Sequence, residues 1–531
     1  MTQHRIGHTR VSRMTGVTSL PAGQETTVPP REIELKFQLL PGSEAILRAD
    51  DIFGPAAQRV HQITTYHDTP DCLLFAAGLS LRIRQVNDSF VQCVKARDNG
   101  HGLASSRDEW QWPVANGTPD VGMLAGVPEL ASIAEQLHGR LGPVIVTDVW
   151  RTSRLHTLPG GAAAEASLDI GSIASGARSE PICELELELK HGPVAPLYRL
   201  AIRLAETAPM WVSAQSKAAR GWSLRHGHDG GAVTLPKVKI GKNVSVAAGL
   251  HQIIGALLSH LTRNIAPTLS GDAEALRQMR GALRNLRAAL RLFAPMLARN
   301  ERTRFDGPLR QFAQTLGAAR DWDVFCLQTL PAAISDLPEI GWKKLSALAG
   351  AKRATLHAAV QEAICGPQFT RLILDLALWA ETCQTTPLDI GTKQLNKRLS
   401  KIAPALLDKI AEKADRAGRH PGRLPMPELH DFRKALDRLN VAVRFLGSPY
   451  PAHAVLAYRK RSDAVRDIIG ATNDAEVTKA LALDLAAAGS PAVSACAAAL
   501  ATWAEQRQAD ALTGLKRAAR KFRTEPVFWR D

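Results

Sequence analysis

Three stretches of the chain alternate charged and apolar residues with a period of two. Residues 32–37 read Glu-Ile-Glu-Leu-Lys-Phe, residues 81–84 read Leu-Arg-Ile-Arg, and residues 184–190 read Glu-Leu-Glu-Leu-Glu-Leu-Lys. Because successive side chains of a β-strand point to opposite faces, each stretch predicts a strand with one charged and one apolar face. A single strand of this kind is most simply a solvated sheet edge or face. Three strands that carry charges of both signs favour a closed barrel with a polar lumen.

The remaining pattern divides the chain into a β-rich part and a helical part. Strands are predicted near 32–40, 79–87, 90–97, 107–114, 145–157, 165–171 and 182–190, and helical spacing occurs at 43–50, 127–138 and 194–207. Past residue 244 the apolar residues recur at intervals of three and four, which predicts helices. We therefore expect an α+β protein: a closed antiparallel β-barrel with flanking helices, then an all-α helical-bundle domain. The expected boundaries are a disordered leader at 1–30, the barrel at 31–225, a linker at 226–243 and the helical domain at 244–531.

The helical part shows signs of an internal duplication. A helix with basic residues near 274–297 precedes the segment Gly317-Ala318-Ala319-Arg320-Asp321, and a second one that begins near 430 precedes Gly470-Ala471-Thr472-Asn473-Asp474. Each half thus has a basic helix followed by a Gly-Ala-x-x-Asp segment. Two stacked bundles of similar design are expected.

The positive charge of the chain is concentrated in its helical part. The formal net charge of the 531 residues is +15. Residues 1–243 contain 25 basic and 24 acidic side chains, whereas residues 244–531 contain 41 and 27. A basic face of this kind favours an anionic partner, such as nucleic acid, a membrane surface or inorganic polyphosphate.

Cysteine use and hydropathy indicate a cytoplasmic protein. The number of cysteines, seven, is odd, and none of them forms a Cys-x-x-Cys pair, so neither a disulfide scaffold nor a zinc ribbon is expected. No uninterrupted apolar run approaches the 18 residues of a transmembrane helix, and the first 30 residues lack the apolar region of a signal peptide. We expect no membrane partner.

The order of the charged motifs resembles the CYTH superfamily, the triphosphate tunnel metalloenzymes. The resemblance covers about residues 31–225. Its motifs are Glu32-Ile33-Glu34-Leu35-Lys36, Tyr66-His67-Asp68-Thr69-Pro70, Leu81-Arg82-Ile83-Arg84, Lys95, Arg107-Asp108-Glu109-Trp110, Arg151, Leu168-Asp169, Glu184–Lys190, Ser216-Lys217 and Arg220-Gly221. The prokaryotic members that it most resembles are inorganic triphosphatases.

The resemblance implies a role for each charged group of the lumen. Substrate-binding cations are expected at Arg82, Arg84, Lys95, Arg107, Arg151 and Lys217, since guanidinium and ammonium groups hold phosphate oxygens. Metal ligands are expected at Glu32, Glu34, Asp169, Glu184 and Glu186, and carboxylates of this kind suit Mg²⁺ or Mn²⁺. Lys36 is the candidate catalytic residue, for moving protons.

Some of these positions have alternatives. Glu188 shares the strand face of Glu184 and Glu186 and could replace one of them. Arg154 competes with Arg151 for the inward position. Arg107 and Glu109 could form a cross-strand ion pair on the outer surface, and Gln111 stands where the family often has a second acid, which puts a metal role for Glu109 in doubt.

The helical part resembles the CHAD domain, which often follows CYTH in one chain and is known for binding inorganic polyphosphate. Its basic residues follow one helix face, with leucines or methionine one residue earlier, and no acid occurs between Glu274 and Glu301. The expected polyphosphate-binding residues are Arg277, Arg280, Arg284, Arg287, Arg291, His430, Arg433 and Arg438. The family pattern usually has His at the position of Arg277 and basic residues at those of Gly281, Asn285 and Asp437, so part of the basic surface is missing.

The predicted function is hydrolysis of tripolyphosphate to diphosphate and phosphate, with polyphosphate bound by the helical domain, at polyphosphate granules of the cytoplasm. Two other functions stay open. The protein could bind polyphosphate without turnover, or hydrolyse an organic triphosphate such as thiamine triphosphate or a nucleotide. Nucleic acid is a weaker candidate partner, because only 5% of residues are aromatic and few bases could stack. The sequence leaves the oligomeric state undetermined.

Overall fold

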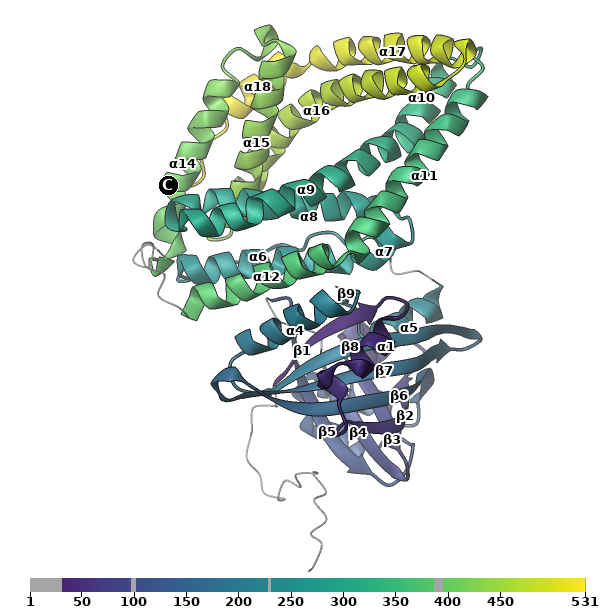
Figure 1. Ribbon diagram of the computed structural model, residues 1–531. Helices are drawn as coiled ribbons and strands as arrows, with labels where there is room; N and C mark the ends of the chain where they lie inside the picture. The colour runs from purple at the N-terminus through teal and green to yellow at the C-terminus, as the bar shows by residue number, and fades with distance from the viewer. Residues whose placement is uncertain (1–30, 97–101, 228–230, 386–394, 531) are drawn as a thin grey trace, which may run out of the picture.

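The computed structural model describes residues 31–96, 102–227, 231–385 and 395–530. A β-barrel and a helical domain are stacked on each other, with α4, α6, α12 and β9 near their boundary (Figure 1). The leader expected at residues 1–30 lies outside the described residues. Among the helices that the structure describes, none has both the length and the apolar composition that crossing a bilayer requires.

Eight antiparallel strands form the closed barrel that the sequence predicts. Their order is β5-β4-β3-β2-β6-β7-β8-β1, and pairing of β1 with β5 closes the sheet, while β9 (Met210–Val212) adds to the second half of β1. The barrel strands are β1 Arg31–Leu39, β2 Gln58–Asp68, β3 Ser80–Val86, β4 Ser89–Lys95, β5 Ser105–Val114, β6 Gly142–Leu158, β7 Ala162–Ser175 and β8 Arg178–His191. Strand β2 is absent from the sequence prediction.

In β1 and β8 the apolar side chains point out of the barrel and the charged side chains point into it, the reverse of a barrel with an apolar interior. Leu35, Phe37, Leu185 and Leu187 are buried in a core on the outside of the barrel wall, which α4 (Ala195–Thr207) helps to form and which continues into α6 of the helical domain. The charged side chains between them therefore point into the barrel. Because helices bury the apolar face of these strands on the outside of the barrel, the polar face can line the interior.

Short helices complete the barrel domain, and long ones make up the second domain. Those of the barrel domain are α1 Ser43–Ala49, α2 Leu73–Ala77, α3 Ala134–Leu137, α4 and α5 Lys217–His226. Those of the helical domain are α6 Val246–Arg263, α7 Ile265–Leu269, α8 Ala273–Leu292, α9 Arg299–Val324, α10 Leu330–Asp336, α11 Lys343–Cys365, α12 Pro367–Thr385, α14 Leu399–Ala417, α15 Met426–Leu446, α16 Ala452–Ala488, α17 Pro491–Leu512 and α18 Leu515–Arg523.

The two Gly-Ala-x-x-Asp segments occupy matching places in the helical domain. One lies in α9, after the basic helix α8, and the other lies in α16, after α15. Burial raises the pKa of Asp321 and that of Asp474, and the charge of Asp474 adds to the shift of Asp321. The charges of Arg280 and Arg433 act on both acids. The two halves thus meet at equivalent residues, in keeping with a duplicated unit.

The two domains share one hydrophobic core. Helix α12 packs on α4 and β9, as Figure 1 shows near the middle of the molecule. The fully buried hydroxyl of Thr370 donates a hydrogen bond of 2.6 Å to the backbone carbonyl of Met210, and Arg371 forms an ion pair with Glu206. This interface fixes one end of the barrel against the helical domain.

Replacing Thr370 with valine is expected to lower the free energy of unfolding by about 1–3 kcal/mol, because the buried Met210 carbonyl loses its donor. Urea unfolding measures the loss. The control is Thr355→Val, which removes an exposed hydroxyl that bonds only within α11. An equal effect of the two substitutions would contradict a stabilising contact between the domains.

Candidate functional site

A cavity of about 440 Å³ occupies the interior of the barrel. All eight barrel strands and α5 contribute to its wall. Its charged lining residues are Glu32, Glu34, Lys36, Arg82, Arg84, Lys95, Arg107, Glu109, Arg151, Glu165, Asp169, Glu186, Glu188, Lys190 and Lys217. The tunnel is therefore a buried space in which both signs of charge are concentrated.

One group of opposite charges is formed by side chains of β1, β4 and the intervening β5. Glu32 accepts hydrogen bonds from Lys95 Nζ at 2.8 Å and from Arg107 Nε at 3.0 Å. Glu34 forms ion pairs with Arg107 and, at 3.2 Å, with Lys36 Nζ. Burial works to raise the pKa of Glu32, but the charges of Lys95 and Arg107 outweigh it and hold that pKa well below its usual range. Both carboxylates of this group are already matched by cations.

A second group joins β7 and β8. Asp169, Glu184 and Glu186 each offer a carboxylate oxygen, and the three oxygens lie within 4.8 Å of one another. The ammonium group of Lys217 lies among them, 2.7 Å from Asp169 Oδ2 and 3.0 Å from Glu186 Oε1, and it also contacts Glu184. Arg151 donates to Asp169 and Glu186. Lys36 bonds to Glu186 at 2.6 Å and so connects the two groups.

The second group has the composition of a site for a hard divalent cation. All three side chains offer carboxylate oxygens, which Mg²⁺, Mn²⁺ and Ca²⁺ prefer. The ammonium of Lys217 occupies the position between them that a cation would take. Burial opposes ionisation of Glu186, but Lys217, Lys36 and Arg151 outweigh it and hold the pKa of Glu186 well below its usual range. The charges of Arg151 and Lys217 likewise outweigh burial at Asp169 and lower its pKa, so these two carboxylates favour the charged form that binds a metal ion.

Arg84 is the cation of the tunnel without a counterion. In the part of the chain that the structure describes, it makes no ion pair or hydrogen bond, and its Nε is buried. Its neighbour Arg82 approaches Glu109 at 3.5 Å. The charge of Arg82, with burial and then Arg151, lowers the pKa of Arg84 to about 10, which keeps it protonated at neutral pH. The wall around β3 thus has an uncompensated positive charge that an anion would neutralise.

The structure gives positions for the alternatives left by the sequence. Arg151 faces the tunnel, whereas Arg154 donates to the carbonyl of Asp51 at 2.6 Å. Arg107 lies inside the barrel and not on its outer surface. Glu188 pairs with Lys190 at 2.7 Å, apart from the three-carboxylate group. Gln111 donates to Glu109 at 2.7 Å.

Lys36 has the environment of a charged group. Burial works to lower its pKa, but Glu186 and Glu34 outweigh it and raise the pKa above its ordinary value. A protonated amine has no lone pair and cannot take a proton from water. In this state Lys36 can bind a phosphate oxygen or donate a proton.

The sequence prediction gives no lining role to the neutral polar residues of the tunnel, although Tyr66 stands in the Tyr66-His67-Asp68-Thr69-Pro70 motif. Gln62, Thr64 and Tyr66 of β2 and Thr147 of β6 line the cavity. Gln62, Thr64 and Tyr66 recur at a spacing of two along β2, which is the sequence signal for this face of the strand. These side chains give the β2 wall hydrogen-bonding capacity without charge.

The basic face of α8 is partly neutralised by acids from other helices. Arg284 bonds to Asp437 of α15 at 3.0 Å, and Arg287 and Arg291 both contact Asp306 of α9 at 3.2 and 3.1 Å. Arg277 pairs with Glu274 of its own helix. Burial, followed by the charge of Arg284, lowers the pKa of Arg280. On α15, His430 and Arg438 are exposed and Arg433 is half-buried.

Family models match both parts of the chain. The model described as CYTH domain matches residues 30–222, and the one described as CHAD domain matches residues 252–483. An inorganic triphosphatase of Haemophilus influenzae is 30% identical over 197 residues, which are 36% of this chain. The match spans 55% of that relative's length.

Two solved structures resemble parts of the fold. The CHAD domain of the plant Ricinus communis is 23% identical, with a TM-score of 0.47, and the match covers 54% of this chain and 96% of that one. A putative adenylyl cyclase from Hippeastrum, described with a dominant triphosphatase activity, is 19% identical, with a TM-score of 0.28. That match covers 37% of this chain and 96% of the other.

Proposed function

Since the chain carries a CYTH domain followed by a CHAD domain, we propose that its tunnel is the site of a metal-dependent inorganic triphosphatase. The substrate is tripolyphosphate, and the products are diphosphate and phosphate. The observation that carries the proposal is the combination of an unpaired Arg84 with a group of three carboxylates in one tunnel. A phosphate chain would neutralise the arginine. A metal ion between the carboxylates and the chain would balance the remaining negative charge.

The cations hold and orient the phosphate chain. Arg82 and Arg84 on β3 and Arg151 on β6 present forked donors, and Lys95 and Arg107 provide further positive charge. Binding such a chain requires several of these groups to leave their present carboxylate partners. Arg84 has no carboxylate partner to leave, so its contact with the phosphate chain forms first and costs the least free energy.

Asp169, Glu184 and Glu186 would hold Mg²⁺ or Mn²⁺. When bound, the ion would polarise phosphate oxygens and neutralise the charge that develops on them. Lys217 then turns from the carboxylates toward the phosphate chain, which agrees with its proposed role in substrate binding. Glu32 and Glu34 remain candidates for a second metal position, provided that substrate draws Lys95 and Arg107 away from them.

Hydrolysis transfers the terminal phosphoryl group to water. The water oxygen forms a bond to the terminal phosphorus, and the bond from that phosphorus to the bridging oxygen breaks. One proton of the water is released to solvent, and Lys36 can donate a proton to the leaving diphosphate and take one back from solvent. Positioning and charge neutralisation contribute most of the rate acceleration in this mechanism.

The CHAD domain is proposed to bind inorganic polyphosphate. Exposed Arg277, Arg284 and Arg291 on α8 and His430 and Arg438 on α15 are the accessible candidates, with Arg280, Arg287 and Arg433 less exposed. Because Asp306 and Asp437 neutralise part of this face, we expect the affinity to be moderate and strongly salt-dependent. Polyphosphate granules of the cytoplasm are the location that this binding predicts.

A panel of metals and substrates tests the proposed function. Phosphate release from tripolyphosphate is expected with Mg²⁺ or Mn²⁺ and not after chelation, at a higher kcat/KM than from ATP or thiamine triphosphate. The assay compares these three substrates and long-chain polyphosphate on the full-length protein. Binding of polyphosphate without phosphate release from any of the four substrates would favour a non-catalytic binding protein. Faster phosphate release from ATP or thiamine triphosphate than from tripolyphosphate would favour a hydrolase of organic triphosphates.

A further inference from the structure

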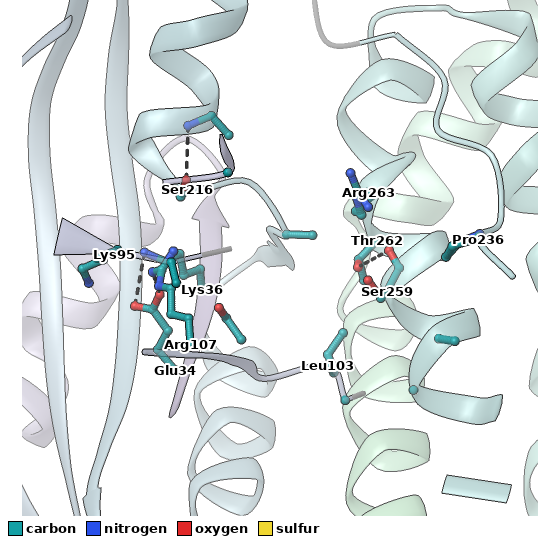
Figure 2. A pocket seen from close by; sticks show the side chains of 18 of the residues that line it. Glu34, Lys36, Lys95, Leu103, Arg107, Ser216, Pro236, Ser259, Thr262 and Arg263 are labelled. Carbon is teal, nitrogen blue, oxygen red and sulfur yellow. Dashed lines mark hydrogen bonds and ion pairs between the residues drawn. The ribbon is translucent and has the colours of Figure 1, made fainter. Parts of the chain in front are cut away.

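One mouth of the tunnel opens into a larger chamber between the two domains. The chamber has a volume of about 910 Å³, and it shares Glu34, Lys36, Lys95 and Arg107 with the tunnel lining. Figure 2 shows these four side chains on the barrel side, with Ser259, Thr262 and Arg263 of α6 on the facing wall. A molecule that extends out of the tunnel at this mouth would therefore enter a space bounded by the helical domain.

The far wall of this chamber has cations without counterions. Arg263 of α6 and Lys237 and Lys239 of the preceding segment line it, all three exposed. Within the described residues, none of the three forms an ion pair or hydrogen bond. Among the lining residues that the structure describes, Glu34 is the acidic one, against six basic ones when the three shared with the tunnel are included. The chamber therefore has an excess of positive charge.

The segment that carries the two lysines is fixed in place. The backbone carbonyl of Val233 accepts a hydrogen bond of 2.9 Å from Asn264 Nδ2 and lies 2.9 Å from His260 Nε2. At the other end, Ile240 is buried and its amide donates to Ser448 Oγ at 3.0 Å. Val238 packs against the core, so Lys237 and Lys239 point away from it in the extended chain. The region expected to be a linker thus presents both lysines at the chamber.

Hydroxyl and amide groups complete a polar lining. Ser213 and Ser216 on the barrel side and Ser259 on α6 face the chamber. The buried Oε1 of Gln252, also in the lining, has no hydrogen-bond partner in the described structure. Hydroxyls donate to phosphate oxygens, and cations spaced along the wall suit a ligand with regularly repeated negative charge.

We propose that this chamber holds the distal phosphates of a linear inorganic polyphosphate whose end lies in the tunnel. The inference rests on the proposed triphosphatase function and adds a preferred substrate class, chains of more than three phosphates. Lys237, Lys239 and Arg263 bind the part of the chain beyond the third phosphate. Tripolyphosphate, which the tunnel alone accommodates, does not reach them.

The test compares long-chain polyphosphate with tripolyphosphate on the full-length protein. In the variant K237S/K239S/R263S, the ratio of the KM for long chains to the KM for tripolyphosphate is expected to rise about tenfold at low salt. The tenfold rise corresponds to the loss of three exposed contacts between a cation and a phosphate, each of modest strength. The increase should largely disappear near 1 M salt, where screening acts over about 3 Å.

A matched control removes the same charge elsewhere. K242S/K343S/K344S replaces three exposed lysines that do not line the chamber, and its KM ratio should equal that of the wild type. An equal ratio in both variants would overturn the proposal, and so would a larger effect of the chamber variant on ATP than on long chains. The latter result would make the chamber a site for an organic group.

Calorimetric binding separates this proposal from the proposed function. Without metal, wild-type protein should bind long-chain polyphosphate more tightly than the chamber variant does, whether or not either substrate is hydrolysed. If the wild type binds long-chain polyphosphate more tightly than the chamber variant but hydrolyses neither substrate, the result would refute the triphosphatase activity and support the chamber as a binding site. Hydrolysis of tripolyphosphate with equal long-chain affinity in the two proteins would refute the chamber alone.

Discussion

Replacing Arg84 with glutamine is expected to lower kcat/KM for tripolyphosphate by about 10²–10³-fold, the usual effect of removing one preorganised donor that faces developing charge. The other cations of the tunnel are paired with carboxylates in the described structure, as Lys95 is with Glu32. Arg84 lines the tunnel, and in the described structure its guanidinium has no ion pair or hydrogen bond. Its loss therefore removes attraction that the remaining residues cannot replace without breaking ion pairs of their own.

The same substitution should leave the ligand-free protein as stable as the wild type or more stable. The pKa of Arg84 is lowered from 12.5 to about 10, so the folded protein disfavours its charged form. At neutral pH the neutral glutamine relieves this repulsion, a gain on the order of 1–3 kcal/mol before lost packing is subtracted. An arginine that binds an anion is expected to lower the stability of the ligand-free protein and still be required for activity.

Steady-state phosphate release and thermal unfolding measure the two effects together. Tripolyphosphate should raise the Tm of the wild type more than that of Arg84→Gln. Arg154→Gln is the matched control, because Arg154 lies on a barrel strand but bonds to a carbonyl of η1 (Asp51–Phe53) outside the tunnel. Wild-type activity in Arg84→Gln, or equal losses in the two variants, would refute the role of Arg84.

The sequence predicts those barrel strands that have charged residues on one face. In β1, β3 and β8, charged and apolar residues alternate, and that pattern is visible without any knowledge of the fold. Strand β2 presents Gln62, Thr64 and Tyr66 to the tunnel and has polar residues on its other face as well. Its hydrophobic pattern is therefore too weak to identify it as a strand.

The partners of each charged group depend on pairings between distant segments. Glu32 lies opposite Arg107 because β1 closes on β5, and Lys36 lies opposite Glu186 because β1 also pairs with β8. Neither register can be read from one sequence. For the same reason the face of α8 appears purely basic in the sequence, whereas packing brings Asp306 and Asp437 against it.

Replacing Glu186 with glutamine is expected to lower the proposed triphosphatase activity by about 10²–10³-fold, because losing a proposed metal ligand would remove several kcal/mol of charge stabilisation. Glu186 also contacts Lys36, Arg151 and Lys217. Removing the charge that these three cations share should cost about 3–5 kcal/mol of stability as well. The concentration of Mn²⁺ that gives half-maximal activity should rise, and stabilisation of the ligand-free protein by Mn²⁺ should be weaker.

Glu188→Gln separates metal binding from a general loss of negative charge. Glu188 lies two residues further along β8 on the same face, yet its ion pair is with Lys190 and it lies outside the three-carboxylate group. If the tunnel only needs acidic residues to balance its cations, the two glutamine variants should lose activity equally. If the group of Asp169, Glu184 and Glu186 binds the metal, Glu188→Gln should stay within about threefold of the wild type, and only Glu186→Gln should change the response to Mn²⁺. Equal Mn²⁺ titrations for the two variants would therefore rule out this group as the metal site, even if both were less active.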